Sequence, residues 1–122
     1  MAKRILIVDD EPQMADMLSI RLEANGYDVV TAHDGQEGLD KARSEKPDLI
    51  ILDLMLPKID GYKVCGLLKK DSRFARIPII MFTARARQED MALGEEMGAD
   101  AYITKPFDSQ VLLAKIKELA KD

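Results

Sequence analysis

The chain has 122 residues, of which 47% are hydrophobic and 33% are charged, a composition typical of one soluble globular domain. Its net charge of −4 disfavours direct binding to nucleic acid, because phosphates would repel it. The lone cysteine, Cys65, permits no internal disulfide, and no apolar run approaches the roughly 20 residues that cross a bilayer. We therefore expect a cytoplasmic chain that binds neither nucleic acid nor a membrane.

Short apolar runs alternate with longer amphipathic stretches along the chain. The apolar runs predict strands near residues 4–9, 28–32, 49–53, 78–82 and 101–104. The amphipathic stretches predict helices near residues 13–25, 36–46, 61–70, 87–97 and 109–120. This alternation is typical of a doubly wound α/β domain, a (βα)5 fold in which helices cover both faces of a five-stranded parallel sheet.

Local signals support the limits of the first and last helices. Pro12 suits the first turn of a helix, where a missing N–H costs nothing. Asn25 and Gly26 are typical of a helix end, and Asp108 can cap the start of the last helix.

Charged residues stand at the ends of three apolar runs. Asp9 and Asp10 end the first run, Asp53 ends the third, and Lys105 follows the fifth. Because the carboxyl ends of parallel strands meet in one crevice, we expect these side chains to converge. The three carboxylates would repel one another unless a cation lay among them, and Mg²⁺ prefers oxygen ligands. The pattern predicts a metal site with one carboxylate left for chemistry.

Asp53 is the candidate for that chemistry. A carboxylate can attack phosphorus and form an acyl phosphate, whose charge then needs neutralisation by a metal and an opposed cation such as Lys105. Thr83, at the end of the fourth run, offers a hydroxyl to a phosphoryl oxygen. Taken singly, an Asp is more often a turn residue, Thr83 a helix cap and Lys105 a solvated charge. Their combination favours the functional interpretation.

Four short motifs carry a resemblance that extends over essentially the whole chain. They read Ile7-Val8-Asp9-Asp10-Glu11, Asp53-Leu54-Met55-Leu56-Pro57, Phe82-Thr83-Ala84-Arg85 and Thr104-Lys105-Pro106-Phe107. In this order and spacing they resemble the receiver domain of bacterial two-component response regulators. The resemblance implies one receiver domain over residues 1–122, with its strands in the order 2-1-3-4-5.

The same resemblance implies a role for each residue of the acidic site. Asp53 would accept a phosphoryl group from a sensor histidine kinase or a phosphotransfer protein. Asp10 would bind Mg²⁺ directly and Asp9 mainly through water, while Asp53 and the backbone carbonyl of Met55 complete the metal site. We expect that Mn²⁺ can substitute for Mg²⁺.

The resemblance further implies a switch rather than a metabolic enzyme. Lys105 would pair with the phosphoryl oxygens, Thr83 would swing toward the phosphate, and Tyr102 would turn inward behind it. This pair would couple the chemistry to the surface of the fourth helix, fifth strand and fifth helix, which would control a partner or effector. The chain would catalyse only its own phosphoryl transfer and autodephosphorylation, and a cis bond is expected at Lys105–Pro106.

The expected output surface departs from the pattern of receivers attached to winged-helix DNA-binding domains, which dimerise through it. Glu95 stands where those receivers usually have an apolar residue, and Ala101 stands where they usually have an aspartate. Met91 and Val111 occupy positions that usually carry charges. We therefore expect a monomer that uses this surface for a different partner.

Two other classes of protein share part of this pattern. A haloacid-dehalogenase-like phosphatase also uses an aspartate nucleophile at a strand end, but it needs a second acid where this chain has Met55. A flavodoxin-like electron carrier shares the fold class, but the acidic run Asp9-Asp10-Glu11 would repel a flavin phosphate.

Overall fold

The computed structural model describes residues 2–84 and 88–120. The strands are β1 (Arg4–Val8), β2 (Asp28–Ala32), β3 (Leu49–Leu52), β4 (Ile79–Thr83) and β5 (Ala101–Thr104). The helices are α1 (Pro12–Ala24), α2 (Gly35–Glu45), α3 (Gly61–Lys70), α4 (Gln88–Glu96) and α5 (Ser109–Leu119). All neighbouring strands are parallel and lie in the order β2-β1-β3-β4-β5, which confirms the predicted topology.

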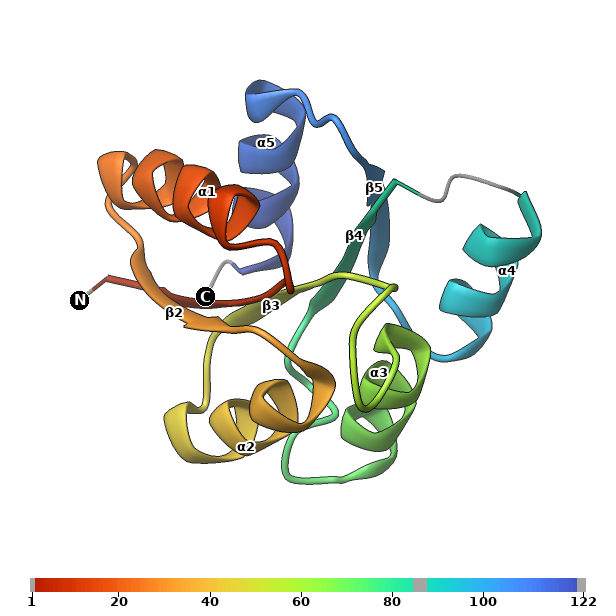
Figure 1. Cartoon of the computed structure of the whole chain (residues 1–122). Helices are drawn as coiled ribbons and strands as arrows, with labels where there is room; N and C mark the ends of the chain where they lie inside the picture. Colours follow the sequence, from red (N-terminus) through yellow and green to blue (C-terminus); the bar gives the residue numbers. More distant parts are fainter. Residues whose placement is uncertain (1, 85–87, 121–122) are drawn as a thin grey trace.

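Helices cover both faces of this sheet, and α1 and α5 share one of them (Figure 1). Under α1 and α5 lies a core of alternate strand residues such as Ile5, Ile7 and Phe82, all at most 1% exposed. The residues between them, including Leu6 and Leu52, pack on the other face against α2 and α3. Because β1 and β3 lie inside the sheet and are covered on both faces, both sets of their side chains are apolar.

Most element limits agree with the sequence pattern to within one residue. Thr83 is the last residue of β4 rather than the first after it, because it pairs with Thr104 of β5. Of the predicted helix 87–97, the structure describes α4 over Gln88–Glu96; residue 87 lies outside the described residues, as does Arg85 of the third motif.

The local signals at helix ends act as expected. Pro12 is in the first turn of α1, Asn25 is its C-cap, and Asp108 accepts hydrogen bonds at the start of α5. Asp34 and Asp60 cap α2 and α3 in the same way, through the amides of the third residue beyond each. The Lys105–Pro106 bond is cis, also as expected. Within residues 2–84 and 88–120, no helix is long and apolar enough to cross a membrane.

Candidate functional site

The acidic residues of the first two motifs meet at the carboxyl edge of the sheet. Asp9 and Asp10 directly follow β1, and Asp53 directly follows the neighbouring strand β3. One carboxylate oxygen from each lies within 4.8 Å of the other two. Asp9 and Asp53 are 1% and 4% exposed, whereas Asp10 faces solvent. The fold therefore brings together the three acids that the sequence singled out.

The donor chemistry of this cluster fits a hard divalent cation. Asp9 Oδ2 is buried and accepts no well-aligned hydrogen bond from the described residues, although the Lys105 ammonium lies 2.9 Å away as an ion-pair partner. This oxygen therefore has a counter-charge on one side and can still bind a second positive partner, because a carboxylate oxygen has two lone pairs. Mg²⁺ binds such oxygens, usually through one or two protein carboxylates and several waters, and an exposed Asp10 leaves room for those waters.

Lys105 supplies the positive charge opposite the acids. Its ammonium lies 2.9 Å from Asp9 Oδ2, 3.0 Å from Glu11 Oε1 and 3.2 Å from Asp53 Oδ2. Burial alone would lower the pKa of Lys105, but its bonds to Asp9 and Glu11 and the charge of Asp53 raise the pKa overall. The lysine therefore stays charged and can meet an anion at this position.

The Asp53 carboxylate is fixed by two hydrogen bonds and is poorly solvated. Its Oδ1 accepts a hydrogen bond of 3.1 Å from the amide of Met55, and its Oδ2 accepts one from Lys105. Burial raises the pKa of Asp53, while the Met55 amide and the Lys105 charge oppose that rise. A raised pKa makes the carboxylate a more basic nucleophile, which suits attack on phosphorus.

A cavity of about 290 Å³ opens over these groups. Its lining residues are Asp10, Glu11, Asp53, Met55, Thr83, Ala84 and Lys105. Thr83 is 1% exposed and reaches this cavity from the end of β4. Tyr102, on β5, is half-buried and lies beside α4, where a Cβ at Gly94 would be 3.4 Å from its ring. Thr83 and Tyr102 thus lie on adjacent strands, between the acidic site and α4.

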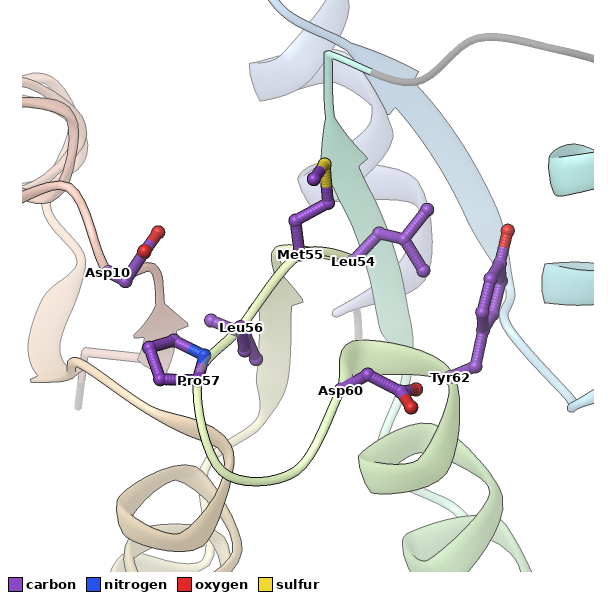
Figure 2. Close-up of a pocket in the computed structure, with 7 residues that line it drawn as sticks. All are labelled: Asp10, Leu54, Met55, Leu56, Pro57, Asp60 and Tyr62. Carbon is purple, nitrogen blue, oxygen red and sulfur yellow. The ribbon is translucent and has the colours of Figure 1, made fainter.

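A second cavity of about 490 Å³ adjoins the acidic site (Figure 2). Asp10 reaches it from the loop after β1, and most of its other lining residues come from the loop between β3 and α3. Met55 lines both cavities and is 58% exposed. Its side chain therefore stands at the mouth of the site, where it flanks the approach to Asp53.

Glu11 is the residue of this site to which the sequence assigned no role. It contacts Lys105 across a sequence separation of 94 residues. Glu11 is the third acid of the run after β1, and this run could have indicated a role in the site. An acid at the start of a helix is, however, explained equally well by the helix dipole. His33 and Cys65 are not among the residues that line the two cavities: His33 is exposed, and Cys65 is buried in α3.

A doubly wound sheet that carries an acidic cluster and a facing lysine at its carboxyl edge defines a receiver-type signalling domain. Comparison with known families agrees: the response regulator receiver domain model matches residues 5–117. The chain belongs to this family. The match favours the receiver interpretation over the phosphatase and electron-carrier alternatives.

Individual relatives support the assignment. The chain is 49% identical over 121 residues to the alkaline phosphatase synthesis transcriptional regulatory protein PhoP of Bacillus subtilis, covering 99% of this chain and 50% of PhoP. It is 50% identical over 118 residues to the DNA-binding dual master transcriptional regulator RpaA of Synechocystis, covering 97% of this chain and 49% of RpaA. The chain thus spans about half the length of these curated relatives.

A solved structure of a receiver domain has the same fold as this chain. The receiver domain of a sensor histidine kinase from Pseudomonas aeruginosa superposes with a TM-score of 0.91 at 29% identity, and the match covers 100% of both chains. That structure has a magnesium ion coordinated in its active site cleft.

Proposed function

We propose that Asp53 is the phosphoacceptor of this receiver domain. Asp53 is the acid of the cluster that lies at the tip of the central strand β3 and receives a hydrogen bond from Lys105. Its Oδ2 would attack the phosphorus of the donor, and the bond from phosphorus to the donor's leaving group would break. The developing charge on the phosphoryl oxygens would face the Lys105 ammonium and the hydroxyl of Thr83.

Asp9, Asp10, Asp53 and the backbone carbonyl of Met55 would hold a divalent cation in the acidic site. When bound, Mg²⁺ would neutralise the charge that develops during phosphoryl transfer. The three carboxylate oxygens of Asp9, Asp10 and Asp53, which lie within 4.8 Å of one another, support this assignment from within the structure. The magnesium ion in the related receiver domain supports it by analogy, and Mn²⁺, which also takes oxygen ligands, would substitute.

The phosphoryl group would come from a sensor histidine kinase or a phosphotransfer protein. Thr83 would move toward the phosphoryl group, and Tyr102, whose ring lies beside Gly94, would turn inward behind it, so that α4, β5 and α5 present a changed surface to a partner. Relatives of twice this length carry a further segment that an output of this kind could control. Beyond its own phosphorylation and autodephosphorylation, the domain would catalyse no reaction.

The contact between Lys105 and the buried Asp53 carries this proposal, and phosphorylation by a small donor tests it. With acetyl phosphate and Mg²⁺, intact mass analysis should show one added phosphoryl group, and a chelator should prevent its addition. Asp53→Asn should abolish labelling. Asp60→Asn is the matched control, because Asp60 lies on the same loop but caps α3, and asparagine caps a helix equally well. Full labelling of Asp53→Asn would refute the proposal.

A further inference from the structure

The Lys105 ammonium is surrounded by carboxylates of two different kinds. Asp9 and Asp53 have side chains 1% and 6% exposed, and they approach it from the ends of β1 and β3. Glu11 contacts it from the solvent side, with a side chain 63% exposed. The ammonium has three N–H donors; it donates hydrogen bonds to Glu11 and Asp53 and lies 2.9 Å from Asp9 as an ion pair.

A phosphoryl group on Asp53 would need one of those donors. Loss of the contact between Asp9 and the ammonium would be unfavourable, because a buried carboxylate without a counter-charge costs free energy. Glu11 can give it up at little cost, because water solvates an exposed carboxylate as soon as the contact breaks. Glu11 is also neither the proposed phosphoacceptor nor a member of the cluster formed by Asp9, Asp10 and Asp53.

We propose that Glu11 is a positioning residue that competes with the incoming phosphoryl group for the Lys105 ammonium and thereby restrains phosphorylation. This inference rests on the proposed role of Asp53. In the unphosphorylated domain Glu11 holds the ammonium toward solvent. It also adds a negative charge at the mouth of the cavity, where an anionic phosphodonor must enter. Both effects slow the phosphorylation of Asp53.

The test compares Glu11→Gln with Glu23→Gln. Glu23 is an exposed acid near the end of α1, so this control removes the same charge at the opposite end of the helix from Glu11. At saturating Mg²⁺, acetyl phosphate should phosphorylate Glu11→Gln roughly threefold faster than the parent at low salt, from the Coulomb energy of one unit charge near the donor. The advantage should shrink as the screening length falls from about 30 Å at 0.01 M to about 3 Å at 1 M salt. Glu23→Gln should match the parent throughout.

A second readout needs neither metal nor phosphoryl group. In Mg²⁺-free protein, NMR of the lysine side-chain nitrogens should show a shifted Lys105 ammonium and faster proton exchange in Glu11→Gln than in Glu23→Gln. A purely structural role for Glu11 at the start of α1 would lower the melting temperature without changing either the salt dependence or this signal.

The possible failures are distinguishable. If Asp53→Asn is labelled like the parent, the proposed function is wrong. If Asp53→Asn is inert but Glu11→Gln has the parent's rate, salt dependence and Lys105 signal, only the role of Glu11 is wrong. A slower rate in Glu11→Gln at saturating Mg²⁺ would also overturn it, because it would show that Glu11 assists rather than competes.

Discussion

Lys105 Nζ lies 2.9 Å from Oδ2 of Asp9, and the two side chains are 9% and 1% exposed. The contact joins the loop after β5 to the end of β1, although β3 and β4 lie between these strands in the sheet. A buried charge that loses its partner costs several kcal/mol, so removal of either residue should destabilise this edge as well as its chemistry. The pair therefore fixes the position of the lysine before any ligand arrives.

Replacement of Asp10 by asparagine should have opposite effects with and without metal. Without Mg²⁺, Asp10→Asn relieves repulsion within the acidic cluster, so the free energy of unfolding should rise by up to about 1 kcal/mol, the usual range for an exposed charge. With Mg²⁺, the variant loses a strong oxygen ligand, so its Mg²⁺ affinity and its phosphorylation should fall. Urea unfolding and Mg²⁺ titration measure the two effects.

Asp16→Asn is the control for that experiment, because Asp16 is an exposed acid on α1 outside the cluster. It should change neither Mg²⁺ affinity nor the response of stability to Mg²⁺. Unchanged Mg²⁺ binding by Asp10→Asn would remove Asp10 from the metal site.

Gly61 should not tolerate a side chain. A Cβ at Gly61 would overlap the carbonyl oxygen of Asp53 and lie 2.7 Å from Cα of Leu54, and backbone atoms cannot move aside as a flexible side chain can. Gly61→Ala should lower the free energy of unfolding by about 1–3 kcal/mol, as overpacking does, and should displace the loop that carries Asp53. Urea unfolding and the phosphorylation rate report the two consequences.

Gly94→Ala provides the comparison, since its added Cβ would make ordinary contacts of 3.4 to 3.6 Å with Tyr102 and Tyr62. Alanine also has a higher helix propensity by about 1 kcal/mol, so this variant should be at least as stable as the parent. Equal stability of Gly61→Ala and the parent would contradict the predicted overlap.

The thiol of Cys65 should make stability fall with rising pH in alkaline solution. Burial raises the pKa of Cys65 from 9.0 to about 11, while the Lys69 charge opposes this rise. Between these values the folded state binds the proton that the unfolded state releases. The free energy of unfolding should therefore fall as pH rises, by up to about 1.4 kcal/mol per pH unit for one proton.

Urea unfolding of the parent and of Cys65→Ala across this range isolates the thiol, because the other titrating groups are common to both proteins. The parent should lose more stability than the variant. A thiol reagent should also react slowly with the native protein and rapidly in urea. Identical pH profiles for the two proteins would show that the thiol is not shielded as described.

The phosphorylated domain should remain monomeric. Glu95 is exposed on α4, and a two-fold interface over α4, β5 and α5 would desolvate two copies of this like charge. Val111, 55% exposed on α5, and Ala101 on β5 cannot supply the charged partners that would compensate. Light scattering with beryllofluoride and Mg²⁺ should give the mass of one chain at micromolar concentration. A tight dimer centred on Glu95 and Val111 would overturn this expectation.

The resemblance to receiver domains implied the strand order of the sheet, whereas the residues by themselves predicted the order of elements and the meeting of Asp9, Asp10 and Asp53. These predictions succeeded because the periodicity of apolar residues is local and because parallel strands always place their carboxyl ends at one edge. The same rule brought Lys105 to that edge, although it could not say which of the acids the ammonium would contact.

Only the tertiary structure decided the individual contacts. The reach of Glu11 to Lys105, the contact of Lys105 with Asp9 and the closeness of Gly61 to the Asp53 carbonyl depend on distances between loops that no local pattern encodes. A one-residue shift also placed Thr83 inside β4, because pairing with Thr104 extends the strand beyond its apolar run. Residue type and spacing determine which groups gather at the edge of the sheet, whereas packing of the whole chain determines which atoms touch, how deeply each is buried and therefore how each is charged.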